Sequence, residues 1–293
     1  MTPGPPSARP PAIIDPASGA HSEASLASPS EPSSWEVLGR RVSVPVEVRR
    51  AGQWSVQYLV PSAAAQRLVD PTGLTVTGPL PGKALVAVAV CRYDDTDLDP
   101  YHEVAMSFVV RAHDAPAAAS GLERLKEFGS GAIGVYIHRL PVDQEFSCAA
   151  GRDIWGFPKW VASIDIDEPS ASDRRRTRRS GTTVRLVDRG RHVLSLTVTG
   201  GGRLQLPAQA PPTYSFRDGV LRRTTWTTSS EGVSGRLGGA TLVLGNHPMA
   251  DELRSLGLPK RALFSSSAAL MRASFDRATV VQAGDRSDAR RRR

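Results

Sequence analysis

The sequence predicts a mainly β fold of the α+β class: a closed antiparallel β-barrel with a few peripheral helices. Short runs rich in Val, Ile and Ala recur along the chain, as do short runs that alternate apolar and polar residues. Both patterns are typical of strands. Helical patterns are few, and many strands joined by short turns favour a closed or sandwiched β architecture.

The expected strands are distributed over most of the chain. The runs at 85–91, 103–110 and 133–138 are apolar, whereas those at 161–167, 184–186 and 192–199 alternate. A long strand at 54–60 precedes them, and the set is completed by 203–206, 220–228, 240–244 and a segment within 265–281.

Helices are expected at three places, with one further turn or two. Residues 62–69 are expected to form a short helix, and 117–128 has the apolar spacing of a surface helix. Residues 248–256 begin with a proline and are followed by Gly257, which is the usual asymmetry of helix ends. One or two helical turns are also expected within 141–153.

Composition suggests one globular domain between two tails. The chain has 293 residues, of which 40% are hydrophobic, enough for a substantial core. Residues 1–33 are rich in Pro, Ser, Ala and Gly without periodicity, so we expect a disordered tail there. We expect a single domain at 34–281 and a basic tail at 282–293.

The net charge of +8 is concentrated in two short arginine clusters. Residues 173–179 contribute 5 − 1 = +4, residues 285–293 contribute 5 − 2 = +3, and the remaining chain is therefore close to +1. A nucleic-acid surface would spread its positive charge over a folded face. We interpret the clusters, 174–179 and 290–293, as a hairpin loop and a frayed tail, and expect no nucleic-acid partner.

Cysteine usage and hydropathy indicate a protein of a reducing compartment. Cys91 and Cys148 lie in apolar runs and suggest no disulfide framework. No run of eighteen apolar residues exists, and the N-terminus lacks the pattern of a secretory signal. We therefore expect a cytoplasmic protein without a membrane partner.

The segment Gly151-Arg152-Asp153-Ile154-Trp155-Gly156-Phe157-Pro158-Lys159 is the most informative in the chain. It places Lys159 after a stiff, aromatic-rich stretch. A neutral lysine amine can attack a carbonyl and form a Schiff base. Because the ordinary pKa of lysine is about 10.4, roughly one amine in 2,500 is neutral at pH 7. Burial against Trp155, Phe157 and Trp160 would disfavour the ammonium form.

This segment resembles the signature Gly-Arg-Glu-x-x-x-aromatic-Pro-Lys of the acetoacetate decarboxylase family, in which the lysine is the Schiff-base residue. Asn246-His247-Pro248 and Leu258-Pro259 resemble the family's C-terminal helix and final strand. The resemblance runs from about residue 40 to 280 and implies the family's β-barrel and oligomeric assembly.

The resemblance also implies further site residues. Tyr101-His102-Glu103 matches the family's Tyr-x-Glu, so Glu103 is the candidate acid that moves protons beside the Schiff base. Tyr101, Trp155 and Phe157 are candidate substrate-binding residues. Arg50 is the candidate anchor for a substrate carboxylate, because a bidentate arginine suits that group.

No other site chemistry is indicated. The histidines lack short metal-ligand spacings, and no nucleophile elbow, Walker loop or dinucleotide fingerprint is present. We expect neither a metal nor a cofactor.

Two departures from the family bear on the substrate. Trp160 stands where family decarboxylases carry a second lysine, and Ala87-Val88-Ala89 stands where they carry a second glutamate. We expect Val88 to stand in place of this substrate-facing carboxylate. The expected function is a cofactor-free Schiff-base lyase acting on a keto acid, with decarboxylation of a β-keto acid such as acetoacetate first. Aldolase-dehydratase chemistry on a 2-keto acid and a non-catalytic ligand-binding barrel remain alternatives, and we expect a homo-oligomer.

Overall fold

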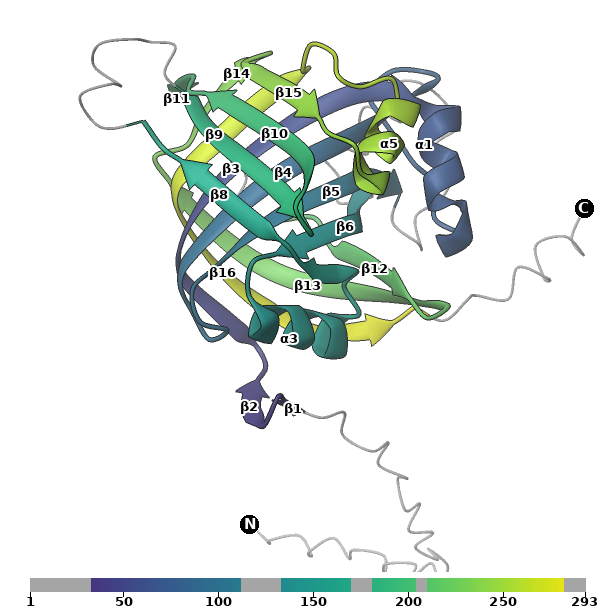
Figure 1. The fold of residues 1–293 in the computed structure, drawn as a ribbon. Coiled ribbons are helices and arrows are strands. Elements are labelled where there is room, and N and C mark those ends of the chain that lie inside the picture. The colour runs from purple at the N-terminus through teal and green to yellow at the C-terminus, as the bar shows by residue number, and fades with distance from the viewer. Residues whose placement is uncertain (1–32, 112–132, 170–180, 204–209, 282–293) are drawn as a thin grey trace, which may run out of the picture. The chain divides into compact units, whose positions relative to one another are not determined.

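The structure, a computed structural model, describes residues 33–111, 133–169, 181–203 and 210–281 (Figure 1). Apart from Ser33, the predicted tails lie outside these residues, as do the predicted helix at 117–128 and both arginine clusters. Among the described helices, none is long and apolar enough to cross a membrane.

Seven strands close into a barrel, which confirms the predicted architecture. Along the barrel they follow the order β16-β13-β12-β6-β5-β4-β3, and β16 pairs with β3 to complete the ring. The pairing is antiparallel except between β6 and β12, which run parallel. The barrel strands are β3 (Val46–Pro61), β4 (Lys83–Thr96), β5 (Tyr101–Arg111), β6 (Ile133–Val142), β12 (Thr213–Arg217), β13 (Val220–Glu231) and β16 (Phe264–Val280).

A second sheet packs on the outside of this barrel. Its order is β15-β10-β9-β8, and all of its pairs are antiparallel. Its strands are β8 (Ser163–Asp167), β9 (Gly181–Asp188), β10 (Arg191–Thr199) and β15 (Ala240–Leu244). The smaller strands are β1 (Ser34–Val37) and β2 (Arg40–Ser43), which form a hairpin, β7 (Lys159–Val161), β11 (Gly202–Arg203) and β14 (Ser234–Leu237).

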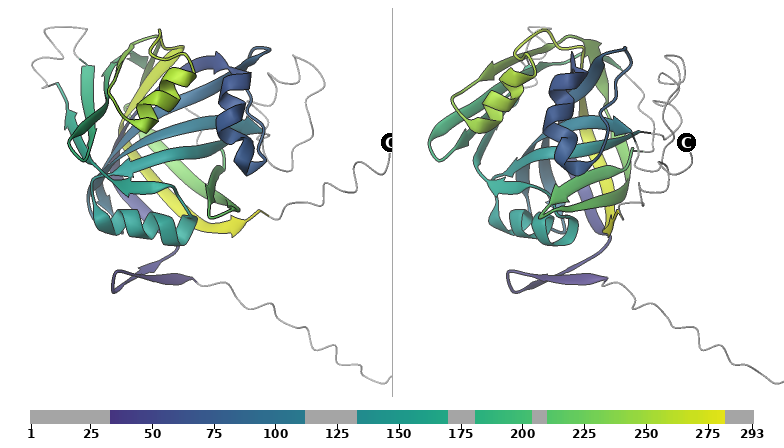
Figure 2. Two further views of the ribbon diagram at one scale, coloured as in Figure 1. Left: turned by 45° about the vertical axis from the view of Figure 1, so that its right-hand side comes forward. Right: turned by 90° about the vertical axis from the view of Figure 1, so that its right-hand side faces the viewer.

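Three α-helices are present in the described residues: α1 (Ser62–Val69), α3 (Glu145–Trp155) and α5 (Pro248–Ser255), with a short 3₁₀ helix, η1 (Asp70–Thr72). The predictions at 62–69 and 248–256 are confirmed. The turn or two expected within 141–153 is a helix of 11 residues that begins and ends later. Figure 2 shows α3 across one end of the barrel.

Most predicted strands are confirmed, with longer bounds. The run at 161–167 is divided between β7 and β8, because the chain leaves the barrel at Ala162 and enters the second sheet. Of 203–206, Arg203 lies in β11 and the rest lies outside the described residues. Strands β1, β2, β12 and β14 were not predicted.

The wall of the barrel has a different set of side chains on each face. Val86, Val88 and Val90 of β4 belong to a core that lies between the barrel and the second sheet, with α1 and α5. Cys91 and Tyr93 belong to a second core, which fills the end of the barrel that α3 covers. The two faces alternate because successive side chains of a strand point to opposite sides.

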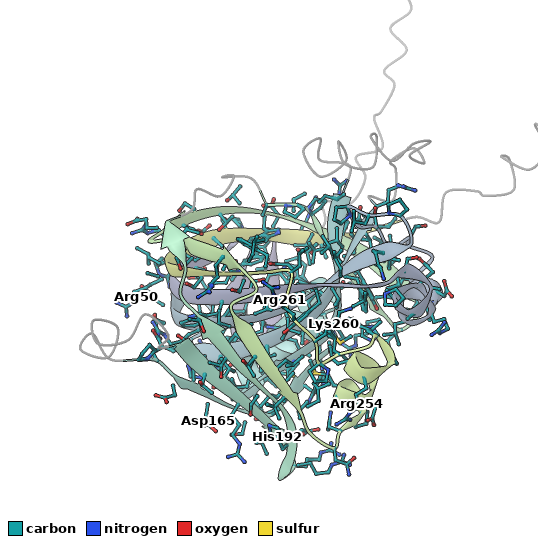
Figure 3. All side chains as sticks on the ribbon, turned by 90° about the horizontal axis from the view of Figure 1, so that it is seen from above. Arg50, Asp165, His192, Arg254, Lys260 and Arg261 are labelled. Carbon is teal, nitrogen blue, oxygen red and sulfur yellow. The ribbon has the colours of Figure 1, made fainter. Side chains whose placement is uncertain are left out.

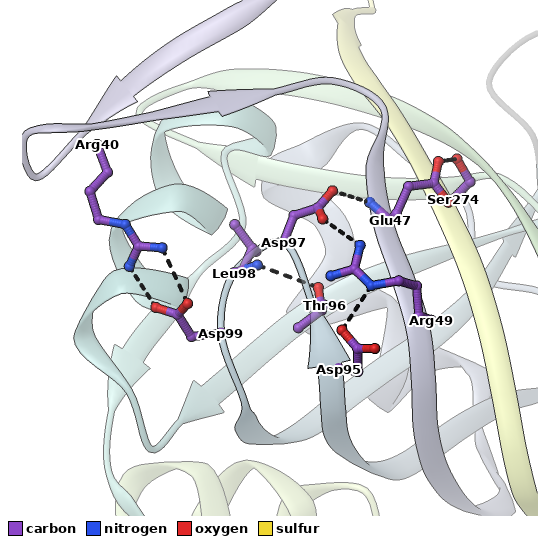
Figure 4. Close-up of polar contacts among 9 residues, drawn as sticks. All are labelled: Arg40, Glu47, Arg49, Asp95, Thr96, Asp97, Leu98, Asp99 and Ser274. Atoms are coloured by element: carbon purple, nitrogen blue, oxygen red, sulfur yellow. Dashed lines mark hydrogen bonds and ion pairs between the residues drawn. The ribbon is translucent and has the colours of Figure 1, made fainter.

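Surface ion pairs hold the turn between β4 and β5 (Figure 4). Arg49 of β3 donates to Asp95 at 2.8 Å and to Asp97 at 2.6 Å. Arg40 of β2 donates to both carboxylate oxygens of Asp99, at 2.5 and 3.2 Å. Exposed pairs of this kind contribute little to stability, but they link β2, β3 and the turn that leads into β5.

Candidate active site

Helix α3 and strand β7 bring Lys159 into the barrel. The Gln144 side chain caps the first turn of the helix by accepting from the Ser147 N–H. At the other end Gly156 has φ +65°, the left-handed conformation that terminates many helices. Phe157 and Pro158 then lead directly into β7, where Lys159 pairs with Leu140 of the parallel neighbour β6.

The Lys159 side chain runs along the surface of α3 at Gly151. A Cβ atom added to Gly151 would lie 2.5 Å from Cδ and 2.7 Å from Cε of Lys159. Real Cβ atoms do not approach other atoms so closely, and protein interiors have little free space to accommodate them. The glycine of the signature therefore leaves the space through which the lysine passes.

Lys159 and Glu103 form a buried ion pair. The Lys159 Nζ lies 2.8 Å from Glu103 Oε2, and the two side chains are 3% and 12% exposed. The other carboxylate oxygen accepts a longer hydrogen bond, 3.4 Å, from the Tyr93 hydroxyl. The amine thus has a proton acceptor within hydrogen-bond reach, as general acid–base catalysis requires.

Two tyrosines complete this cluster. Tyr93 and Tyr101 stack with ring centroids 4.4 Å apart, and the Lys159 Nζ lies 4.9 Å from the Tyr101 ring centroid. Burial raises the pKa of both phenols well above the usual value. Tyr93 therefore remains a proton donor to Glu103, and Tyr101 offers an aromatic face to a cation.

Strand register corrects the role expected for Val88. Cys91 lies directly across from Glu103, whereas Val88 lies across from Met106 on the other face of the wall. Val88 is fully buried in the core outside the barrel and does not face the site. Ala87 and Ala89 are the residues of that tripeptide on the inner face. Burial, followed by the charge of Glu103, raises the pKa of the Cys91 thiol to about 12.

The aromatic residues of the signature divide between the two cores. Trp155 and Phe157 are buried in the core around the ion pair and stack at 5.9 Å. Trp160 packs against the outer core and stacks on His247 at 6.5 Å. The expectation that Trp160 desolvates Lys159 is therefore wrong: adjacent residues of β7 point to opposite faces.

Arg152 and Asp153 of the signature segment are both helical. Both lie in the last turns of α3. The Arg152 Nε donates to the Lys159 carbonyl oxygen at 2.7 Å, so this arginine ties the helix to the start of β7.

Arg50 does not lie with the other candidates. Its side chain is 65% exposed, its Nε lies 3.7 Å from Asp94, and Figure 3 shows it at the edge of the molecule. Its role as a carboxylate anchor stays a prediction. The sequence did not predict a role in the site for Tyr93, Cys91 or Gly151. Of these residues, Gly151 could have been noticed, because it is the first residue of the signature.

A cavity of about 770 Å³ lies elsewhere, against the outer side of the wall. Trp54, Arg92 and Glu168 are among its lining residues, and none of the predicted site residues lines it. Within the described residues, no group of three or more His, Cys, Asp or Glu side chains could hold a metal ion.

A closed barrel with a buried lysine–carboxylate pair at its helix-covered end defines a class of protein. A family model described as acetoacetate decarboxylase matches residues 37–283. The chain belongs to this acetoacetate decarboxylase family, as its signature segment indicated. No curated protein gives a significant match to the sequence.

Solved structures share the fold at low sequence identity. Acetoacetate decarboxylase from Legionella pneumophila is 18% identical, with a TM-score of 0.61 over 81% of this chain and 87% of that one. An acetoacetate decarboxylase-like enzyme from Sphingomonas wittichii is 16% identical, with a TM-score of 0.61 over 83% and 96%. The enduracididine biosynthesis enzyme MppR, complexed with the condensation product of pyruvate and imidazole 4-carboxaldehyde, is 16% identical, with a TM-score of 0.58 over 80% and 88%.

Proposed function

We propose that this protein is a cofactor-free lyase that forms a Schiff base between Lys159 and the ketone of a keto acid. One observation carries the proposal: the Lys159 amine is buried and lies 2.8 Å from the Glu103 carboxylate. A lysine nucleophile needs a group that removes its proton at the moment of attack. Glu103 is in position to take that proton and to return it later.

The first stage joins amine and ketone. Glu103 takes a proton from the Lys159 ammonium, the nitrogen attacks the carbonyl carbon, and the carbonyl oxygen leaves as water to give a protonated imine. The positive nitrogen lies beside the Glu103 carboxylate and the Tyr101 ring, both of which stabilise a cation.

The second stage breaks a carbon–carbon bond. In a β-keto acid the electron pair of the bond to the carboxylate moves toward the iminium nitrogen as carbon dioxide leaves, which produces an enamine. Protonation of the enamine carbon and hydrolysis by water release the ketone product and the free amine. With acetoacetate, the anion and one proton, which is added to the enamine carbon, give carbon dioxide and acetone, so atoms and charge balance.

Aldolase-dehydratase chemistry is the alternative reaction of the same imine. A 2-keto acid bound to Lys159 can lose a proton to give an enamine, add to an aldehyde and lose water. The bound condensation product of pyruvate and an aldehyde in MppR favours this candidate. The inner face beside Glu103 carries Cys91 and alanines instead of a further carboxylate, which suits a substrate other than acetoacetate.

Borohydride trapping tests the proposal directly. The chain has four lysines, Lys83, Lys126, Lys159 and Lys260, so an adduct is easily assigned by peptide mass mapping. Reduction in the presence of acetoacetate should leave an isopropyl group on Lys159, because decarboxylation precedes hydrolysis. With pyruvate the adduct should keep its carboxylate.

Substitutions separate the roles. Lys159→Met should abolish trapping, and Glu103→Gln should slow it by about 10²–10⁴-fold, the usual contribution of a general base. Lys260→Met, at an exposed position, is the matched control and should trap normally. If neither acetoacetate nor pyruvate modifies Lys159, the proposal is wrong; a Lys159 adduct without carbon dioxide release would favour the aldolase-dehydratase alternative.

A further inference from the structure

The inner face of the barrel wall continues beyond the ion pair as a strip of small and polar side chains. By register, Ser55 lies across from Ala89, which lies across from Ala105. One step further along, Gln57 lies across from Ala87, which lies across from Ser107. No register shift interrupts these pairs, so all of them share the face of Cys91 and Glu103.

Alanine on this strip leaves room inside the barrel. Side chains normally fill the interior of a barrel of about eight strands. On the outer face of the same strands, Val86, Val88 and Met106 are fully buried, whereas Ala87 and Ala89 on the inner face are half-buried. The inner face between Glu103 and Gln57 therefore carries small side chains, which leave part of the barrel interior unfilled.

Gln57 presents a buried acceptor at the far end of the strip. Its Nε2 donates to Ser55 Oγ at 2.9 Å. Its Oε1 is buried and has no hydrogen-bond partner in the structure. Buried polar atoms are nearly always paired, and an unpaired one requires a specific explanation.

From these observations we infer that the substrate is a keto acid with an extended chain, and that Gln57 accepts a hydrogen bond from a donor near the end of that chain. This inference rests on the proposed Schiff-base function. Cys91 lies across from Glu103, and Ala87 lies across from Gln57. These two residues of β4 are four positions apart, so the ion pair and Gln57 are separated along the strand by about 13 Å, at ~3.3 Å per residue. Acetoacetate is too short to contact both Lys159 and Gln57, whereas a longer keto acid with a terminal hydroxyl, amide or amine reaches both.

Borohydride trapping at Lys159 with matched ligands tests the inference. The probes are straight-chain 3-keto acids of increasing length that end in a methyl, a hydroxyl or a methoxy group. At one length the hydroxyl compound should be trapped at about tenfold lower concentration than the other two, equivalent to about 1.4 kcal/mol. Methoxy is an acceptor without a donor, so equal or better trapping of the methoxy compound would overturn the inference.

Two variants assign the effect to this strip. Gln57→Met should reduce the tenfold preference to none while acetoacetate is trapped as in the wild-type protein. Ala87→Leu should block the long compounds and spare acetoacetate, which also covers the case in which Gln57→Met fails to fold. If acetoacetate is trapped but the hydroxyl compound has no advantage at any length, the extended-substrate inference is wrong and the Schiff-base proposal stands. If no keto acid is trapped, both fail.

Discussion

At the scale of single residues, the position of the Lys159 amine depends on the absence of a side chain at Gly151. We predict that Gly151→Ala lowers the rate of the Lys159 reaction by about 10²-fold, the usual cost of displacing a reacting group by about 1 Å. The helix should remain intact, because alanine is favoured over glycine in a helix by about 0.5–1 kcal/mol. Trapping kinetics and circular dichroism measure the two effects separately.

The control for this substitution is Gly200→Ala. An added Cβ at Gly200 would have no neighbour within 4 Å, so that variant should react at the wild-type rate. A wild-type rate in Gly151→Ala would show that the lysine does not need the space at Gly151.

The sequence predicts which residues form the site better than it predicts where those residues lie relative to one another. The signature pointed to Lys159 and Tyr-x-Glu pointed to Glu103, and the structure brings the two together. Tyr93 and Cys91 carry no motif, since their roles arise from strand pairing: Cys91 faces Glu103 across β4 and β5. Such a pairing depends on the length of the turn between strands, which local patterns do not determine.

At the scale of elements, the face of a strand decides which residues reach the site. We predict that Val88→Glu destabilises the protein by more than about 3 kcal/mol, because it places a carboxylate in a fully buried apolar core. Ala89→Glu, on the half-buried inner face, should fold with much smaller loss. Urea denaturation of both variants measures the difference, and the reverse order would contradict the assignment of the faces.

The same scale shows where pattern reasoning was insufficient. Alternating and apolar runs identified most strands. Burial on one face gives an alternating sequence, and burial on both faces gives a continuous apolar run. Helix α3 was underestimated because Gly151 and Asp153 are weak helix formers; burial of Ile154 and Trp155 against the end of the barrel outweighs this. β12 has five residues and pairs in parallel with β6, which local sequence does not predict.

At the scale of the whole molecule, an ion-pair cluster joins helix α5 to the barrel. Glu252 accepts hydrogen bonds from His138 at 3.2 Å and from the Arg139 Nε at 3.0 Å, both on β6. Burial by itself would raise the pKa of Glu252, but the hydrogen bonds from His138 and Arg139 outweigh it and lower the pKa to about 2.

This cluster predicts a loss of stability in acid. Because the pKa of Glu252 is lower in the folded than in the unfolded state, its contribution is present above about pH 4.5 and is lost as the pH falls toward 2. The wild-type protein should therefore lose about 2 kcal/mol more unfolding free energy between pH 5 and pH 2.5 than Glu252→Gln does. Denaturation at both pH values measures this, and equal losses would contradict the role of Glu252.

The pairing of Cys91 with Glu103 has a consequence for chemical selectivity. A thiol with a pKa of about 12 is ionised in roughly one molecule in 10⁵ at pH 7. In the proposed reaction a carbonyl compound would thus meet two potential nucleophiles, the Cys91 sulfur and the Lys159 nitrogen, on residues that neighbour the same carboxylate. Burial and, after it, the charge of the Glu103 carboxylate keep the sulfur protonated, so thiohemiacetal formation and oxidation of the thiol are both suppressed where we propose that the imine forms.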